Sequence, residues 1–163
     1  MENMKKIVTI TGHKHTKKGI IATELARNSD VEYVRPYTAR SLPKDIEPSI
    51  LEAEYNVVLP SVLDDMMKKE KILAVTEIGK HKYVYFEFQF RKPYSVIIAD
   101  DYAVVNIKSN WDGKIFTIRA VSDKEEPSER VDEFLYKHEF DTIFDYERDD
   151  IYELEHLIGE ENG

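Results

Sequence analysis

Apolar and polar positions change their period along the chain, and the first change falls near residue 12. Residues 7–10 form a short apolar run rich in β-branched side chains, which is typical of a buried strand, whereas apolar positions in residues 20–26 recur at helical spacing. Gly12 lies between these segments and permits a sharp turn. The start of the chain is predicted to form a strand, a tight loop and a helix.

The same pattern predicts alternating strands and helices along the rest of the chain. Further strands are predicted at residues 31–34, 54–59, 72–78, 83–90, 94–99, 115–121 and 140–144. Helices are predicted over residues 60–69, 101–108, 127–138 and 149–159. This order favours a single α/β domain, residues 1–163, with a mostly parallel sheet, helices on both faces and an inserted antiparallel lobe at about residues 41–90.

Two segments allow more detailed predictions. Side chains alternate along residues 83–90, so we expect a half-buried strand with Tyr83 and Tyr85 on its more polar face. Ser61 followed three residues later by Asp64 resembles a capping box, which predicts a helix starting near Pro60.

Composition narrows the class of protein. With 163 residues, 42% hydrophobic and 34% charged, the chain is typical of one globular domain. It contains no stretch near the roughly 18 consecutive apolar residues of a membrane span, and its first apolar run is too short for a signal peptide. The absence of cysteine excludes disulfides and thiolate chemistry. We expect a cytoplasmic protein that does not engage a membrane.

The net charge of −9 is concentrated near the end of the chain. From Ser122 onward, Asp and Glu outnumber Lys and Arg by 16 to 4, whereas the preceding residues are mildly basic. Phosphate backbones repel such an acidic quarter, so binding to nucleic acid is disfavoured. A basic protein partner remains open, and so does acidity without any binding role.

The loop after the first strand resembles a phosphate-binding loop. In the pattern G-x-x-x-x-G-K-[ST], Gly12 fits the first glycine and Lys18 fits the lysine. Lys17 stands in place of the second glycine, and Gly19 replaces the hydroxyl residue that holds magnesium.

Basic side chains crowd the start of the following helix. They are His13, Lys14, His15, Lys17 and Lys18. Cations at this end of a helix are disfavoured by about 0.3–1 kcal/mol each, and a bound anion removes that penalty. The loop is therefore predicted to bind an anion or a phosphate; a solvated basic loop and a protein contact are the alternatives. No metal site is predicted at the two histidines, because no complementary ligand cluster accompanies them.

Three residues outside the loop are candidates for the same site. Arg40 follows the second strand, where open α/β sheets place ligand residues, although it also reads as an ordinary surface arginine. Asp100 ends the strand at residues 94–99 and can touch a ligand or cap the following helix. Tyr83 can stack on a base or pack within the protein.

The order of these features resembles guanylate kinase and the related phage-type deoxynucleoside monophosphate kinases over nearly the whole chain. The segments that carry the resemblance are ITGHKHTKKGIIATELA, YVRPYTAR and EYNVVLPSVLDDMMKKEKILAVTEIGKHKYVYF. SVIIADDYAVV, IFTIRAV and FDTIFDYERDDIYELEHLI match the later core strands and the last helix in position.

The resemblance implies roles for individual residues. Lys18 would contact the donor phosphates and Gly12 would shape the turn, with Lys14, Lys17 and Gly19 in the same nucleotide-binding loop. Arg40 and Tyr55 would hold the acceptor phosphate, Tyr83 would do likewise or stack on the base, and Asp100 would read a guanine or support a metal. Lys18 and Arg40 would be the catalytic residues, and ATP and Mg²⁺ the cofactors.

The sequence also departs from the family pattern. Lys17 and Gly19 alter the phosphate loop, and the missing hydroxyl makes a role for Mg²⁺ doubtful. Ala74 stands where the family has a guanine-reading glutamate, with Glu77 nearby, and Pro43 or Lys44 lies where a second acceptor arginine is expected.

The lid region, about residues 122–138, differs most from the family. It is short and acidic, and its arginine content is Arg130 alone. Arginines in such a lid stabilise the transferring phosphoryl group. Their loss predicts weak catalysis or none.

The sequence favours a guanylate-kinase-like protein that binds a nucleotide or another phosphate-bearing ligand. We expect weak or no phosphoryl-transfer activity, as in a pseudoenzyme. One alternative is an active, divergent (deoxy)nucleoside monophosphate kinase that uses ATP, with Lys14, Lys17 or Arg119 supplying the missing charge. Another is an acidic interaction or inhibitor protein that engages a basic host partner.

Overall fold

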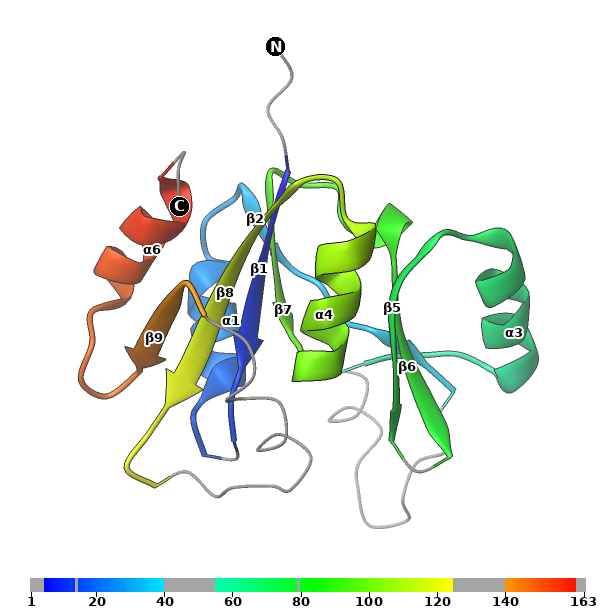
Figure 1. The fold of residues 1–163 in the computed structure, drawn as a ribbon, viewed down its shortest axis with the longest axis horizontal. Coiled ribbons are helices and arrows are strands. Elements are labelled where there is room, and N and C mark those ends of the chain that lie inside the picture. Colours follow the sequence, from blue (N-terminus) through cyan, green and yellow to red (C-terminus); the bar gives the residue numbers. More distant parts are fainter. Residues whose placement is uncertain (1–4, 14, 40–54, 79, 125–139, 161–163) are drawn as a thin grey trace.

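The protein is described by a computed structural model that covers residues 5–13, 15–39, 55–78, 80–124 and 140–160 (Figure 1). A five-stranded sheet forms its centre. The strands are β1 (Lys6–Thr11), β2 (Val31–Tyr33), β7 (Tyr94–Ile98), β8 (Lys114–Val121) and β9 (Thr142–Asp145). They lie in the order β2-β7-β1-β8-β9, and every neighbouring pair is parallel. The predicted α/β fold with a parallel sheet is confirmed.

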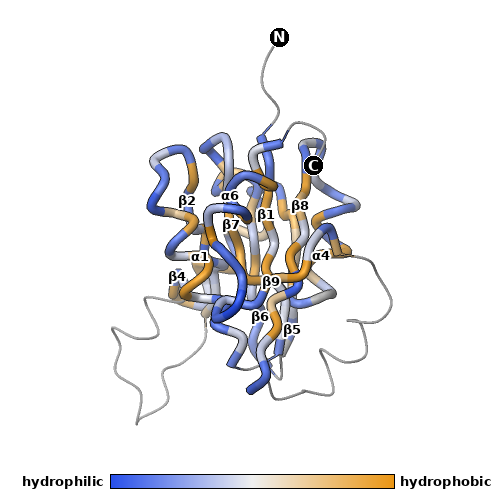
Figure 2. Tube along the Cα trace, turned by 90° about the vertical axis from the view of Figure 1, so that its left-hand side faces the viewer, coloured by the Kyte–Doolittle hydropathy of each residue, from blue (hydrophilic) through white to orange (hydrophobic). Residues whose placement is uncertain are grey.

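Helices cover both faces of this sheet (Figure 1). On one face, α1 (Lys18–Leu25) and α6 (Ile151–Gly159) pack against Val8 and Ile10 of β1. On the other face, α4 (Asp101–Asn110) packs in the cluster that contains Ile7. Because elements cover both faces of the sheet, all six residues of β1 are buried, including the polar Lys6, Thr9 and Thr11. Hydrophobic positions gather along β1, β7 and β8 in Figure 2.

A second sheet lies beside the first. Its strands are β3 (Tyr37–Thr38), β4 (Asn56–Val57), β5 (Ile72–Ile78) and β6 (His81–Phe86), in the order β4-β3-β6-β5. The β3–β6 and β5–β6 pairs are antiparallel, as predicted for the inserted lobe, whereas β3 and β4 are parallel. The helix α3 (Pro60–Lys69) packs on this sheet through Leu63.

The two sheets share a core. Leu73 and Tyr85 of the second sheet are buried in the same cluster as Val104 and Ile107 of α4. The Tyr85 hydroxyl donates to the backbone oxygen of Ile98 at 3.0 Å, and burial raises the pKa of this phenol well above 10.0. The second sheet is therefore packed directly against the carboxyl end of β7.

The prediction of a half-buried strand over residues 83–90 is wrong in two respects. The strand β6 ends at Phe86 and a 3₁₀ turn, η1 (Glu87–Gln89), follows, in which the Gln89 side chain accepts a hydrogen bond from the Phe86 N–H at 2.9 Å. Residues of both faces are buried, including Tyr83 and Tyr85. The reason is that α3 covers one face of the sheet and the α4 cluster covers the other.

The observed starts of the helices agree only partly with those predicted from the sequence. The predicted helix at residues 60–69 is confirmed, but its N-cap is Leu59, and no side chain caps it, so the capping box is wrong. Pro60 begins the helix instead, because its fixed φ and missing N–H suit the first helical position. Asp100 and Asp150 do cap α4 and α6. The helix predicted over residues 127–138 lies outside the described residues.

No helix in the described ranges is both long and apolar enough to cross a membrane.

Lys6 connects the first strand to the last helix. Its side chain is only 4% exposed, and Nζ donates to the backbone oxygens of Ile158 at 2.7 Å and Glu160 at 3.0 Å. These oxygens belong to the carboxyl end of α6, where helix carbonyls lack partners within the helix. A cation is favoured there, although burial lowers the pKa of Lys6 from 10.5.

Replacement of Lys6 by methionine is expected to lower the free energy of unfolding by about 1–3 kcal/mol, because a buried carbonyl loses its donor. Urea unfolding monitored by circular dichroism measures the change. Lys108→Met is the control, since Lys108 is exposed on α4. Equal stability of the two variants would contradict this role for Lys6.

Candidate phosphate-binding cleft

Gly12 makes the close approach on which the loop between β1 and α1 depends. A Cβ atom at this position would lie 2.6 Å from the Ala120 oxygen of β8 and 2.9 Å from the Thr16 Oγ1. Any side chain here would therefore push the loop away from β8. Thr16 is itself buried and donates through Oγ1 to the His13 oxygen at 2.8 Å, which closes the loop from within.

Two residues of the loop have left-handed backbone conformations. His15 has a φ of 68°, and Lys17, the N-cap of α1, has a φ of 62°. Such a conformation costs a residue with a side chain roughly 1–2 kcal/mol. Lys17 thus adopts the backbone conformation that glycine favours, at the position where the phosphate-loop pattern has its second glycine.

Lys18 lies across the loop. Its Nζ donates to the backbone oxygens of Gly12 at 2.9 Å and His13 at 2.7 Å, and lies 3.4 Å from the Thr16 hydroxyl. The side chain of Lys18, the first residue of α1, therefore points toward the end of β1 and places its positive charge there.

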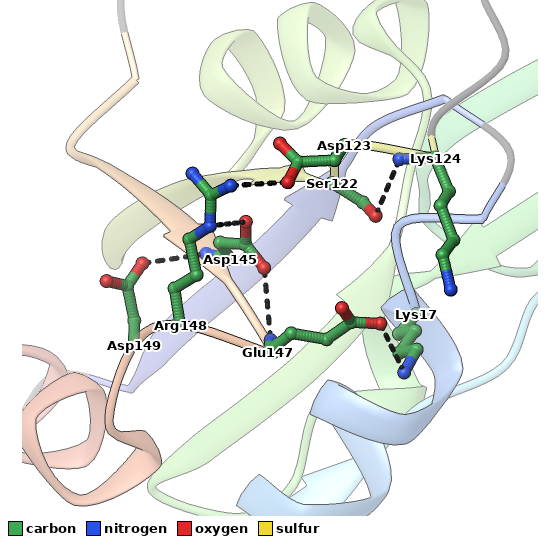
Figure 3. A network of polar contacts seen from close by, with 8 residues as sticks. All are labelled: Lys17, Ser122, Asp123, Lys124, Asp145, Glu147, Arg148 and Asp149. Carbon is green, nitrogen blue, oxygen red and sulfur yellow. Dashed lines mark hydrogen bonds and ion pairs between the residues drawn. The ribbon is translucent and has the colours of Figure 1, made fainter.

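Lys17 has a different partner. Its Nζ lies 2.9 Å from the Glu147 carboxylate (Figure 3). The same atom lies 5.4 Å from the centre of the Tyr146 ring. The hydrogen bond between the two side chains raises the pKa of Lys17 and lowers the pKa of Glu147. Lysines at the start of α1 are thus stabilised by groups of the protein itself, so a bound anion is not required to explain them.

Glu147 belongs to a polar network that follows β9 (Figure 3). Its N–H donates to the Asp145 carboxylate at 3.0 Å, and the Asp145 N–H donates to the Asp149 carboxylate at 2.8 Å. Arg148 pairs with Asp123, which follows β8. The network fixes the segment between β9 and α6 beside the start of α1.

A cleft of about 810 Å³ opens beside this loop. It is lined by α1, the end of β2 and residues of the second sheet, including four Lys or Arg side chains, Lys17, Lys18, Arg27 and Arg35, and one acidic side chain, Glu24. A smaller hollow of about 200 Å³ shares Lys18, Tyr55 and Tyr85 with it.

Most of the predicted site residues lie around these two cavities. Gly12, Lys18, Tyr55, Tyr83 and Asp100 line the smaller hollow. Lys17, Lys18, Gly19 and Tyr55 line the larger cleft. Lys14 and Arg40 lie outside the described residues, as do Pro43, Lys44 and Arg130.

Asp100 and the tyrosines have contacts within the protein. Asp100 caps α4 by accepting from the Ala103 N–H at 2.9 Å, and the Thr76 hydroxyl lies 3.4 Å from the same carboxylate oxygen. The rings of Tyr55 and Tyr83 pack together with centroids 5.0 Å apart. Asp100 therefore has the capping role that was one of its two predicted roles.

The loop does not fit the magnesium site of a phosphate-binding loop. Gly19 has no hydroxyl group, and the Thr16 hydroxyl already donates to the His13 oxygen. A Cβ at Gly19 would meet nothing within 4 Å, so the space for a serine is present although the ligand is not. Within the described ranges, no group of three or more His, Asp or Glu side chains is arranged to hold a metal ion.

The sequence analysis missed two basic residues of the larger cleft, Arg27 and Arg35. Arg27 lies just after α1, and Arg35 just after β2. The signal for Arg35 was its position, because it directly follows a predicted strand at the edge where α/β sheets bind ligands.

Comparisons with known proteins bear on the fold. No protein-family model matches the chain, and no curated protein matches its sequence. Among solved structures, the guanylate kinase from Anaplasma phagocytophilum matches with a TM-score of 0.62 and 12% sequence identity, over 97% of this chain and 84% of that one. The chain has a guanylate-kinase-like fold.

Proposed function

We propose that the protein binds a nucleotide or another phosphate-bearing ligand in the 810 Å³ cleft, with weak or no phosphoryl transfer. The observation that carries this proposal is the position of Lys18, which is held at the phosphate-type loop and lines both cavities. The fold supports the ligand class, because the structure it resembles is that of a guanylate kinase.

The composition of the cleft favours an anion of this size. Among the described residues that line it, four are Lys or Arg and one is acidic, and that acidic residue, Glu24, accepts a hydrogen bond from the Tyr146 hydroxyl at 2.7 Å. Cavities of about 300–1,000 Å³ bind molecules the size of nucleotides. Tyr33, Tyr55 and Tyr85 add aromatic surface for the remainder of such a ligand.

The same residues argue against efficient transfer. Phosphoryl transfer depends on positioning and on neutralising the charge of the phosphates, to which a loop-bound magnesium contributes. Here Gly19 provides no hydroxyl for the metal, and Lys17 is paired with Glu147. An active (deoxy)nucleoside monophosphate kinase is the second candidate, favoured by the fold alone.

A role for the acidic carboxyl-terminal quarter in binding a basic protein remains a separate prediction. Asp123, Asp145 and Glu147 of this region form contacts within the protein, which explains part of its acidity without a partner.

Lys18→Ala is expected to weaken binding of ATP and of inorganic triphosphate by about ten- to a hundredfold, because a charge-assisted hydrogen bond to phosphate is lost. Isothermal titration calorimetry in magnesium-free buffer measures the affinities. Lys108→Ala, on the opposite face of the central sheet, is the matched control and should bind as the wild type does. Failure of the wild type to bind ATP, ADP, any nucleoside monophosphate or triphosphate would contradict the proposal.

Alanine at Gly12 and at Gly19 should have opposite effects. Gly12→Ala places a Cβ against the Ala120 oxygen and is expected to lower both stability and ATP affinity. Gly19→Ala meets no atom and should stabilise α1 by roughly 0.5–1 kcal/mol, since alanine favours a helix. Thermal unfolding and calorimetry distinguish the two. Destabilisation of similar size in both variants would show that the loop lacks the described close approach.

Serine at Gly19 would restore a potential magnesium ligand in open space. We expect ATP affinity of the wild type to be nearly independent of Mg²⁺, and that of Gly19→Ser to increase with it. Parallel assays with Mg²⁺-ATP and a panel of monophosphates measure diphosphate formation. Rapid turnover by the wild type would establish the kinase alternative instead.

A further inference from the structure

Arg35 follows β2 and is held in place through its backbone. Its carbonyl oxygen accepts hydrogen bonds from the Asn56 Nδ2 at 2.8 Å and the Gln89 Nε2 at 2.7 Å. The Asn56 N–H donates to the oxygen of the next residue, Pro36, at 2.9 Å. Because a residue before proline is restricted to extended conformations, the position of Arg35 is fixed from both sides.

The side chain of Arg35 is positioned by an aromatic ring and not by a carboxylate. Its guanidinium carbon lies 4.3 Å from the centre of the Tyr33 ring, the distance of a cation–π contact. The Nε atom is buried and has no hydrogen-bond partner. Within the part of the chain that the structure describes, the contacts of Arg35 include no ion pair with Asp or Glu.

The location of Arg35 relates it to the cleft. It lines the 810 Å³ cleft together with Lys18, and it also lines a polar hollow of about 360 Å³ on its other side. The guanidinium therefore forms part of the wall between two cavities.

This arrangement is costly unless a ligand contributes. A buried donor without an acceptor costs about 1–3 kcal/mol. Guanidinium groups that are fixed and stacked on a ring are well suited to phosphate, because their donors match two phosphate oxygens at once. An anion in the cleft would supply the negative partner that the described residues do not.

We infer that Arg35 contacts a phosphate group of the ligand bound in the cleft, as a second cation that acts together with Lys18. The inference rests on the proposed function. In the family that the chain resembles, a second arginine for the acceptor phosphate is expected later in the chain, where this sequence has Pro43 or Lys44. We assign that positive charge to Arg35, at the end of β2. The contact with the Tyr33 ring positions the guanidinium for binding to the phosphate.

The test compares inorganic triphosphate and ATP as probes, titrated into the wild type, Arg35→Gln and Arg35→Lys by calorimetry. We expect Arg35→Gln to lower both affinities by about tenfold or more, and Arg35→Lys to lower them less, since charge is kept while the paired hydrogen bonds and ring stacking are lost. Lys108→Gln is the control, because it removes one exposed positive charge on α4, outside the cleft. It should change the affinities by about threefold or less.

A chemical rescue separates a ligand contact from a purely structural role. Arg35→Ala removes the side chain beside Tyr33, and guanidinium ion at low millimolar concentration should restore part of its triphosphate affinity. Lys18→Ala should show no such rescue. If Arg35→Gln is unfolded by circular dichroism, the Arg35→Lys affinities and the rescue decide the question.

The outcomes distinguish this inference from the proposed function. If Lys18→Ala loses affinity while Arg35→Gln binds as the wild type does, Arg35 is not a ligand contact and the proposed function stands. An equal loss in Lys108→Gln would also overturn the inference, because the effect would then be one of general charge. The absence of rescue by guanidinium would overturn it too, because the role of Arg35 would then be structural. If the wild type binds neither probe nor any nucleotide, both fail.

Discussion

Parallel pairing of β1 with β7 and β8 is the constraint from which the rest of the cleft follows. The three strands run in register, with Ile10 opposite both Ile98 and Ile118. Their carboxyl ends therefore reach the same edge of the sheet, as does that of β2, which pairs with β7. This edge holds Gly12 after β1, Asp100 after β7 and Arg35 after β2. A ligand site assembled from segments distant in sequence is the direct consequence of this geometry.

The lysines Lys17 and Lys18 of the loop have partners within the protein, so their charge does not by itself indicate a bound anion. Lysines at the amino end of a helix suggest a bound anion, but Lys17 is paired with Glu147 and Lys18 donates to two carbonyl oxygens. A ligand is therefore expected not from the number of charges in the loop but from the position of Lys18 in the wall of both cavities. Arg35 adds a further reason, because among the described residues its backbone and its guanidinium are held by neutral groups, Asn56, Gln89 and the Tyr33 ring.

Much of the fold could be predicted from the sequence because its signals are local. The change of period around Gly12 identifies β1 and α1, and Asp100 and Asp150 identify the starts of α4 and α6. The burial of β6 could not be predicted, because it depends on α3 and α4 packing from opposite sides. Within the site, Tyr83 and Asp100 were proposed from the residue pattern and Tyr55 through the resemblance. The contacts that hold Arg35 could not be predicted, because Asn56 and Gln89 are distant from it in the sequence.

The place of β1 in the sheet also governs how the chain acquires its structure during synthesis. The central strand β1 precedes both of its neighbours in the chain, because β7 and β8 come from residues 94–121. Until that part of the chain has left the ribosome, an apolar strand lacks both of its pairing edges, a state that favours aggregation. The Lys6 side chain gains its partners later still, since α6 follows β8 and β9 in the chain. Folding of this domain can accordingly be completed only after α6 has been made.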